Sequence, residues 1–313
     1  MRSYSPQLGS YLKFDGDEFY GWPIMDSFQA QGNTEIGMSI PETSRRLEKM
    51  RVWYRREHRL KRAIASPRVL VFHAEWLHDD DIWRRVEWFA GWLSVKDIKA
   101  TFFVYPFRAR VAGRDIAGRV RALGLLGHEV GQHTHFYNGT KIEKPKKTVD
   151  LSELNIVHCL RRDFETLAQM GSLPKGFTAG SWTVDERVLD ILADLRFDYD
   201  CSAQFPKPNE MTQANSYSWL RSPYIHSNSR GHVLCLPTTC SLGEWFKWGR
   251  RVRTGGMIPY QLVYLHDYDL RSFRNRRLLS YFVKISGKGT LRPLTAIAQE
   301  YRRKEVDGVG PCE

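Results

Sequence analysis

The segment that decides the fold is Gly127-His128-Glu129-Val130-Gly131-Gln132-His133-Thr134-His135-Phe136-Tyr137. In an extended strand, residues i and i+2 point to the same side of the backbone. A strand that ends in this segment therefore presents His133 and His135 together. Two neighbouring imidazoles are a natural pair of ligands for one divalent metal ion. The competing interpretation is a chance pair of half-buried histidines that are only hydrogen-bonded.

Two other apolar segments end in residues of the same chemical kind. Residues 67–76 read PRVLVFHAEW, which fits a buried strand of about seven residues with His73 and Glu75 on one face. Residues 262–269 read LVYLHDYD, a second buried strand that ends in His266. Polar groups gathered at strand ends are the usual layout of a catalytic site in α/β proteins. The sequence therefore predicts a site built from three strands.

The apolar periodicity between these segments alternates between the strand and helix patterns, which favours a parallel sheet or barrel of the α/β class. Strands are expected at 68–74, 99–105, 177–180, 198–201, 232–236 and 262–266, and helices at 80–96, 112–126, 150–170 and 186–195. Capping-box spacings at 150–153 and 183–186 mark two of the helix starts. The carboxylates at 79–81 also read as a helix start, where they favour the helix dipole. The alternative is that one of them is a catalytic base.

The bulk composition is that of an ordinary globular chain with a basic excess. Its 313 residues are 42% hydrophobic and 13% aromatic, with a net charge of +12. An irregular arm and a basic helix are expected at 1–66, an α/β domain at 67–285 and a basic tail at 286–313. The aromatic content suits a sugar-binding groove and a well-filled core equally.

Part of the charge excess is concentrated at 44–63, where nine Lys or Arg stand against two Glu. Such a segment either contacts an anionic partner, including an anionic glycan, or forms a solvated helix face. No RNA-binding or helix-turn-helix pattern accompanies the charge, so nucleic acid is not the favoured partner.

The cysteine pattern and the hydropathy indicate a reducing compartment. Five cysteines without a Cys-x-x-Cys pair do not form a disulfide framework. The first residues lack the apolar segment of a signal peptide, and no stretch approaches the roughly 20 apolar residues that span a bilayer. A cytoplasmic protein without a membrane span is expected.

The segments KATFFV at 99–104 and GHEVGQHT at 127–134 resemble the polysaccharide deacetylase family, also known as the NodB-homology domain or carbohydrate esterase family four. The segments PKGFTAG at 174–180, FDYDCS at 197–202 and LVYLHDYD at 262–269 resemble further motifs of that family. The resemblance covers about 67–270, and it implies a distorted (β/α) barrel of about seven strands.

The same resemblance implies a chemistry. The family binds a divalent metal, usually zinc, through one acidic residue and two histidines, and it removes acetyl groups from N-acetylated sugars. Carried onto this chain, Glu75, His133 and His135 are the expected metal ligands. His73 then stands at the position of the base, and His266 is expected to protonate the leaving amine. An enzyme of surface-polysaccharide biosynthesis that hydrolyses the acetamide of a sugar or glycan is the expected function.

Substrate-binding residues and departures from the family motifs complete this expectation. Trp182, Tyr268 and Thr178 are expected to contact the sugar. His73 replaces an acidic residue of the first motif, Tyr137 stands where the family has its second histidine, and Thr178 and Gly180 replace an Arg and a Pro. These changes support a second hypothesis, a catalytically degenerate domain that binds glycan or a partner protein.

Overall fold

The computed structural model describes residues 67–137, 149–206, 217–248, 258, 260–287 and 290–306. The predicted arm and basic helix at 1–66 lie outside these residues. The domain boundaries predicted from the sequence stay predictions. No helix in the described part of the chain combines the length and the apolar character that crossing a membrane requires.

The described chain forms one nine-stranded sheet with the order β6-β7-β5-β4-β3-β2-β1-β9-β8. All neighbouring strands run parallel except β6 and β7, which are antiparallel. The strands are β1 (Arg68–Ala74), β2 (Thr101–Val104), β3 (Glu129–Thr134), β4 (Gly176–Ala179), β5 (Tyr199–Asp200), β6 (Tyr224–Ser227), β7 (His232–Cys235), β8 (Cys240–Ser241) and β9 (Gln261–His266).

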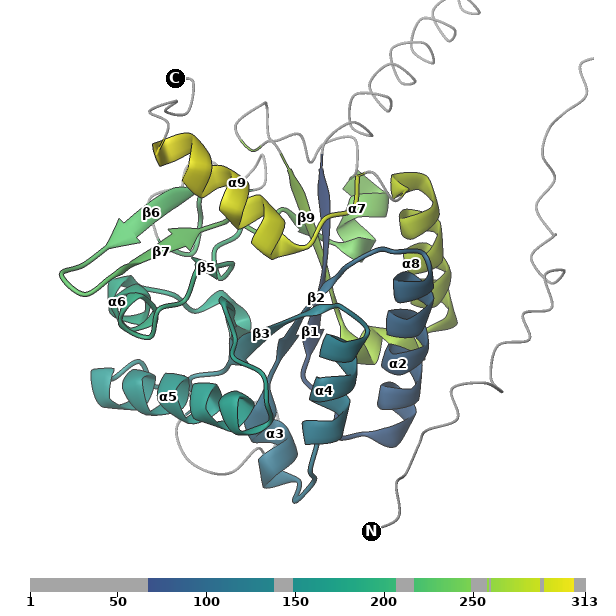
Figure 1. Ribbon diagram of the computed structural model, residues 1–313, viewed down its shortest axis with the longest axis horizontal. Coiled ribbons are helices and arrows are strands. Elements are labelled where there is room, and N and C mark those ends of the chain that lie inside the picture. The colour runs from purple at the N-terminus through teal and green to yellow at the C-terminus, as the bar shows by residue number, and fades with distance from the viewer. Residues whose placement is uncertain are drawn as a thin grey trace, which may run out of the picture. The chain divides into compact units, whose positions relative to one another are not determined.

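Helices follow most of the strands and cover the outside of the sheet (Figure 1). The helices are α2 (Asp80–Val95), α3 (Pro106–Val111), α4 (Ala117–Leu125), α5 (Glu153–Gln169), α6 (Glu186–Asp194), α7 (Leu242–Trp248), α8 (Phe273–Ser286) and α9 (Leu294–Val306), with 3-10 turns η1 (Gly180–Trp182) and η3 (Asp267–Arg271). In Figure 1, α2, α4 and α8 lie on one side of β1, and α5 and α6 lie beside the β4–β7 half of the sheet.

The predicted α/β class and distorted barrel are confirmed, with two more strands than the expected seven. The additional strands carried no usable signal in the sequence. Strand β8 has only two residues, and β6 is a half-exposed edge strand that lacks an apolar run. Strands this short and polar produce no hydrophobic periodicity that could predict them.

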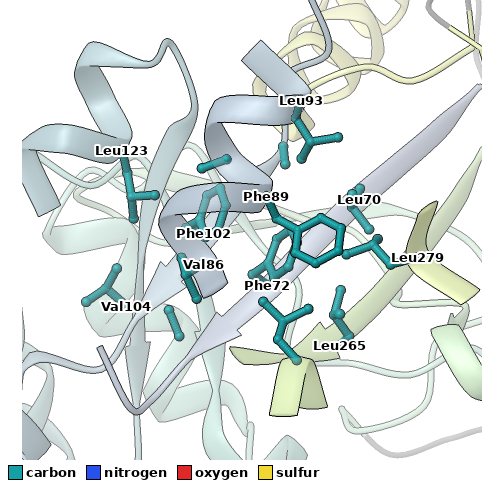
Figure 2. Close-up of a cluster of buried hydrophobic side chains, with 14 of the residues drawn as sticks. Leu70, Phe72, Val86, Phe89, Leu93, Phe102, Val104, Leu123, Leu265 and Leu279 are labelled. Carbon is teal, nitrogen blue, oxygen red and sulfur yellow. The ribbon is translucent and has the colours of Figure 1, made fainter. Parts of the chain in front are cut away.

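The two faces of β1 belong to two different cores, because successive side chains of a strand point to opposite sides. Leu70 and Phe72 face outward and pack against Val86 and Phe89 of α2 (Figure 2). The ring of Phe72 stacks on that of Phe102 with centroids 4.5 Å apart. This outer core attaches the helices to the sheet.

The inward residues of β1 form the second core, which fills the barrel. Val69 and Val71 pack there with Phe103 of β2 and Leu262 of β9. Helix α9 contributes the buried Leu294, Ile297 and Ala298 to the same cluster. The inner core therefore forms a hydrophobic floor beneath the residues that follow on the same strand face.

Helix α9 is attached to the amino ends of the strands by a buried carboxylate. Glu129 of β3 accepts hydrogen bonds from the Thr101 hydroxyl at 2.9 Å and from the Thr295 amide at 3.2 Å. Burial raises the pKa of Glu129, and these hydrogen bonds oppose the rise. A carboxylate at the first turn of α9 also matches the positive end of the helix dipole. The helix therefore closes this end of the barrel.

The helix starts differ from the predicted capping boxes. Helix α6 is capped by Asp185, whose side chain accepts from the Val188 amide at 3.1 Å, and not by Thr183. The N-cap of α5 is Ser152, and Asp150 instead accepts from the Ser152 amide within the preceding turn. Asp and Ser both satisfy exposed amides at helix starts, so spacing alone does not decide which one is the cap.

Two leucines on α4 give a matched test of the outer core. Leu123 is fully buried, whereas the Leu125 side chain two residues later is 89% exposed. Leu123→Ala should lower the free energy of unfolding by about 2–5 kcal/mol, because it leaves a cavity. Leu125→Ala should change it by less than about 0.5 kcal/mol. Urea unfolding followed by circular dichroism measures both, and equal losses would contradict this packing.

The buried Asp200 of β5 gives a pH-dependent test. Burial raises the pKa of Asp200 to about 7, against the two hydrogen bonds that the carboxyl accepts from Ser202. Between about pH 4 and about pH 7 the folded state therefore binds one more proton than the unfolded state. The stability that this group contributes is lost as the pH rises through that range. Asp200→Asn should reduce the fall in unfolding free energy between pH 5 and 8 by on the order of 3 kcal/mol. The exposed Glu165, changed to Gln, is the control and should leave the profile unaltered.

Candidate metal centre

Three strands bring histidines to the inner face of the barrel at its carboxyl end. In the sheet register, His73 of β1 lies opposite His266 of β9 and opposite Phe103 of β2. Phe103 in turn lies opposite Gly131 of β3, two residues before His133. All of these residues continue the inward face that carries Val69 and Val71. The histidines therefore lie directly above the hydrophobic floor.

Glu75, His133 and His135 converge, with ligand atoms that all lie within 4.8 Å of one another. The Nε2 atoms of both histidines are 3.6 Å from Oε1 of Glu75. Two ligand atoms on one tetrahedral zinc ion are about 3.4 Å apart. Each imidazole nitrogen thus stands at a distance from the carboxylate oxygen that a shared cation would need to change only slightly.

The environment of His133 fits a metal ligand. Its Nδ1 atom lies 2.9 Å from the carbonyl oxygen of Thr178, so Nδ1 carries the proton and donates it. The lone pair is then on Nε2, which is buried and has no hydrogen-bond partner among the residues that the structure describes. Buried polar atoms without a partner are rare, and a carbonyl that fixes the tautomer is typical around metal-binding histidines. A divalent cation would satisfy this nitrogen.

Arg108 of α3 holds the other oxygen of the Glu75 carboxylate at 3.2 Å. Its guanidinium also stacks on the Trp76 ring, 3.5 Å from the centroid. Burial by itself raises the pKa of Glu75, but the neighbouring His133 and His135 outweigh it and lower the pKa. The carboxylate is therefore ionised, and Arg108 turns Oε1 toward the histidines. No local pattern connects Arg108 to Glu75, which stands on a different βα unit.

His135 follows the end of β3 and is held by close neighbours. A Cβ atom on Gly180 would lie 2.1 Å from Nδ1 of His135, so only glycine allows this ring position. On another side the Tyr137 ring stacks on His135 with centroids 4.9 Å apart. Tyr137 therefore supports the imidazole beside it, and His135 brings a second nitrogen to Glu75.

His73 lies beside the three converging residues but is not one of them. Its ring stacks on those of His133 and Tyr264, with centroids 5.1 and 5.0 Å away. Only 4% of the residue is exposed. Burial, followed by the nearby His133 and His266, lowers the pKa of His73 well below its ordinary value. The imidazole is therefore neutral at pH 7.

His266 stands on the open side of the site. Its Nε2 atom is 3.8 Å from Oε1 of Glu75, and 27% of its side chain is exposed. The Tyr268 ring stacks on it at 4.7 Å. Asp269 accepts a hydrogen bond from the His266 amide at 3.0 Å and lies 3.8 Å from the ring Nδ1. Asp269 thus orients an imidazole that a bound molecule can reach.

Asp267 anchors the turn that carries Glu75. Its carboxylate accepts from the Trp76 amide at 2.6 Å and from the Tyr268 amide at 2.9 Å. Burial raises the pKa of Asp267 to about 7, in opposition to these hydrogen bonds. The carboxylate joins the segment after β1 to the segment after β9, so it connects the two sides of the site.

The expected substrate-binding residues differ in their accessibility. Tyr268 and Trp182 are partly exposed, whereas Thr178 is fully buried and reaches the site through its carbonyl. The Trp182 ring lies 5.7 Å from His73 and 5.0 Å from Tyr264. Trp182 has a φ of +57°, a left-handed conformation that is strained for a bulky residue and typical of functional sites.

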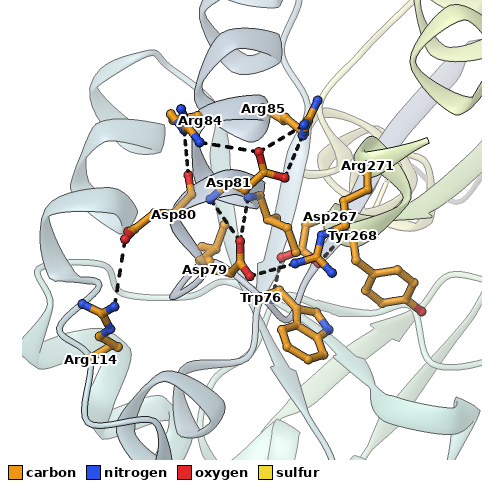
Figure 3. Close-up of polar contacts among 12 residues, drawn as sticks. Trp76, Asp79, Asp80, Asp81, Arg84, Arg85, Arg114, Asp267, Tyr268 and Arg271 are labelled. Atoms are coloured by element: carbon orange, nitrogen blue, oxygen red, sulfur yellow. Dashed lines mark hydrogen bonds and ion pairs between the residues drawn. The ribbon is translucent and has the colours of Figure 1, made fainter. Parts of the chain in front are cut away.

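The acidic run at 79–81 is a helix start and takes no part in the site (Figure 3). Asp79 caps α2 by accepting from the Asp81 and Ile82 amides at 3.0 Å, and it also pairs with Arg271 at 2.8 Å. Asp80 pairs with Arg119, and Asp81 with Arg85. With these partners the three carboxylates are structural, as the favoured interpretation of the sequence held.

A buried hydrogen-bond network holds Thr134, the residue between His133 and His135, in place. Thr134, which points away from the site, donates to the Asp163 carboxylate at 2.9 Å. Arg162 donates to the other oxygen of Asp163 at 2.9 Å, and Gln132 donates to the Thr134 hydroxyl at 3.0 Å. The sequence does not predict these partners, because Arg162 and Asp163 read only as polar positions of a helix.

No protein-family model and no curated protein matches the chain. Among solved structures, a candidate polysaccharide deacetylase from Mycobacterium smegmatis superposes with a TM-score of 0.55 at 17% identity, over 77% of this chain and 92% of that one. A pseudoenzyme of carbohydrate esterase family four from Bacillus anthracis gives 0.46 at 13%, over 74% and 65% of the two chains. A family four carbohydrate esterase from Streptomyces lividans gives 0.40 at 13%, over 71% and 86%.

The identities are too low to transfer an activity, so the similarity to the Mycobacterium smegmatis structure concerns the backbone. The chain therefore has the fold of the polysaccharide deacetylases, a distorted (β/α) barrel, with divergent motifs.

Proposed function

We propose that this protein is a metal-dependent hydrolase that removes acetyl groups from an N-acetylated sugar or glycan. The observation that carries the proposal is the convergence of Glu75, His133 and His135, with both histidine Nε2 atoms 3.6 Å from one carboxylate oxygen. One oxygen and two nitrogen ligands suit zinc, the expected ion, and leave a coordination position open for chemistry. A divalent cation in such a site supplies Lewis acidity and makes water a stronger acid.

The remaining histidines are placed for proton transfer. His73 is buried and neutral beside His133, and it would take the proton from the attacking water as general base. His266 is exposed to incoming molecules and oriented by Asp269, and it would protonate the departing amine. Two imidazoles in these roles would need no cation to keep a carboxylate base ionised, so the proposed chemistry does not require the Arg of the family's third motif.

The sugar is proposed to lie between the partly exposed rings of Trp182 and Tyr268. Flat aromatic faces bury the apolar side of a pyranose at low entropic cost. Thr178 would contribute only through its carbonyl contact with His133, since its side chain is buried. Substrate selection would then depend on the aromatic rings at the open side of the site.

The competing proposal is a degenerate domain that has kept the barrel and binds glycan or a partner without turnover. It rests on the departures at His73, Tyr137, Thr178 and Gly180. For two of these departures, a feature of the structure compensates for the change and supports an active site. His135 provides the nitrogen that Tyr137 does not, and Gly180 makes room for that ring. We therefore favour the hydrolase.

Metal content and acetate release test the hydrolase. Purified protein should bind about one equivalent of zinc and release acetate from a panel of acetylated monosaccharides, chitooligosaccharides and nucleotide-linked acetamido sugars. Chelation should abolish release, and added zinc should restore it. Glu75→Ala should lose both metal and activity, because it removes one of three ligands. His73→Gln should keep the metal and lower kcat/KM by about 10²–10⁴-fold.

The exposed carboxylate Glu165, changed to Ala, is the matched control and should retain metal and activity. Stoichiometric metal without acetate release from any member of the panel would overturn the hydrolase and support the degenerate domain. Failure to bind any divalent metal would overturn the metal centre itself.

Gly180→Ala tests the position of His135 without changing a ligand. The new methyl group would overlap His135 Nδ1, so the ring must move and zinc affinity should fall by at least about tenfold. Gly118→Ala in α4 is the control, because no atom lies within 4 Å of the added carbon. Competition with a chromophoric chelator measures both affinities. Equal affinities would show that His135 does not bind the ion in this position.

A further inference from the structure

Helix α8 presents two aromatic rings and two cations to solvent along one line. Its inner face buries Leu279, Phe282 and Val283 against the sheet. Its outer face carries Phe273, Arg277, Tyr281 and Lys284, at the i, i+4, i+8 and i+11 spacing of a single helix face. Phe273 is 65% exposed and Tyr281 is 55% exposed. We call these four residues the α8 strip.

The charge of α8 is positive throughout. The helix contains Arg274, Arg276, Arg277 and Lys284 and no acidic residue. Among the described residues, no carboxylate lies within ion-pair distance of these four cations. Arg276 instead donates to the carbonyls of Leu270 and Arg271, and the guanidinium groups of Arg276 and Arg277 lie 5.7 and 5.6 Å from the Phe273 ring.

The surface continues onto the neighbouring helix α2. A hollow of about 390 Å³ between the two helices is lined by Asp81, Arg84, Arg85, Trp88, Phe89 and Arg276. Trp88 is 52% exposed at this hollow. Asp81 is the only carboxylate in the lining and is already paired with Arg85 at 3.0 Å (Figure 3). The hollow therefore adds a third aromatic ring and further positive charge to the strip.

We propose that the α8 strip, together with Trp88, docks this protein on an anionic lipid membrane surface. Aromatic rings mixed with Arg and Lys on an exposed helix face match the interfacial zone of a bilayer, where rings enter the headgroup region and cations meet phosphates. Anionic leaflets attract basic surfaces of this kind, and the net charge of +12 strengthens the attraction. The contact is peripheral and needs no spanning helix.

The charge pattern selects this occupant over two others. A second copy of the chain would bring the same positive strip, and like charges would repel. A nucleic acid would also meet the cations, but its phosphates do not explain why Phe273, Tyr281 and Trp88 stay exposed between them. A lipid surface accommodates rings and cations together. The inference does not depend on the proposed hydrolase, since binding and acetate release are measured separately.

Co-sedimentation of the full chain with vesicles tests the docking. Binding to vesicles of phosphatidylcholine and phosphatidylglycerol in a 3:1 ratio should exceed binding to pure phosphatidylcholine and should weaken in 0.5 M salt. Arg277→Gln with Lys284→Gln should lower the partition coefficient about 25-fold, about fivefold for each charge removed. Phe273→Ser with Tyr281→Ser should lower it on the order of tenfold, including at low salt.

Matched surface pairs on other helices are the controls. Leu125→Ser with Leu154→Ser removes two apolar side chains that are at least as exposed as those of the strip, and Arg110→Gln with Arg161→Gln removes two exposed cations. Both control pairs should bind within twofold of the unaltered protein. Amide hydrogen exchange of the unaltered chain locates the contact without any variant. Adding vesicles should slow exchange in α8 and leave exchange in α4 unchanged.

Three results would overturn the proposal. One is the absence of preference for anionic vesicles. Another is unchanged binding in both α8 variants, with loss only when Arg45, Arg46, Arg55 and Arg56 are replaced by Gln. The third is loss of binding to duplex DNA in the charge variant while the aromatic variant binds vesicles normally, which would assign the surface to nucleic acid.

Discussion

The alternation of side chains along three parallel strands is the constraint on which the rest of the structure depends. In β1 the residues at 69 and 71 fill the barrel, so His73 and the following Glu75 must also face inward. The same alternation places His133 and His266 on the inner side of β3 and β9. A slip of one residue in any of these strands would turn its histidine toward the helices. The strand register that builds the hydrophobic floor therefore also positions the polar site.

The charge of Glu75 explains several features around it. An ionised carboxylate in a buried site is costly unless cations or donors surround it. Arg108 meets one oxygen and the histidine nitrogens stand near the other. Arg108 is itself held flat against Trp76, whose amide binds Asp267. The carboxylate is therefore positioned by a chain of contacts that joins α3, the turn after β1 and the turn after β9.

Much of this architecture could be predicted, because it rests on local patterns. The run at 68–74 agrees with the bounds of β1, and the strand-end residues Glu75, His133 and His135 were expected to meet before their distances were known. The contacts of Arg108 with Glu75 and of Asp163 with Thr134 could not be predicted, since each joins elements whose relative placement only the folded chain determines. The capping residue of α6 was misplaced for a simpler reason, because two suitable side chains stand two positions apart.

The interior strand β1 has a further consequence for the order of events during synthesis. Its two neighbours are β2 and β9, which stand on either side of it in space but at opposite ends of the barrel sequence. The floor beneath the histidines is completed only by Leu294, Ile297 and Ala298 of α9. Such long-range pairing is slow to form and late to close. A ribosome-bound chain that has emerged only as far as β7 would hold His133 and Glu75 without the finished floor beneath them, so the site is complete only after α9 has been synthesised.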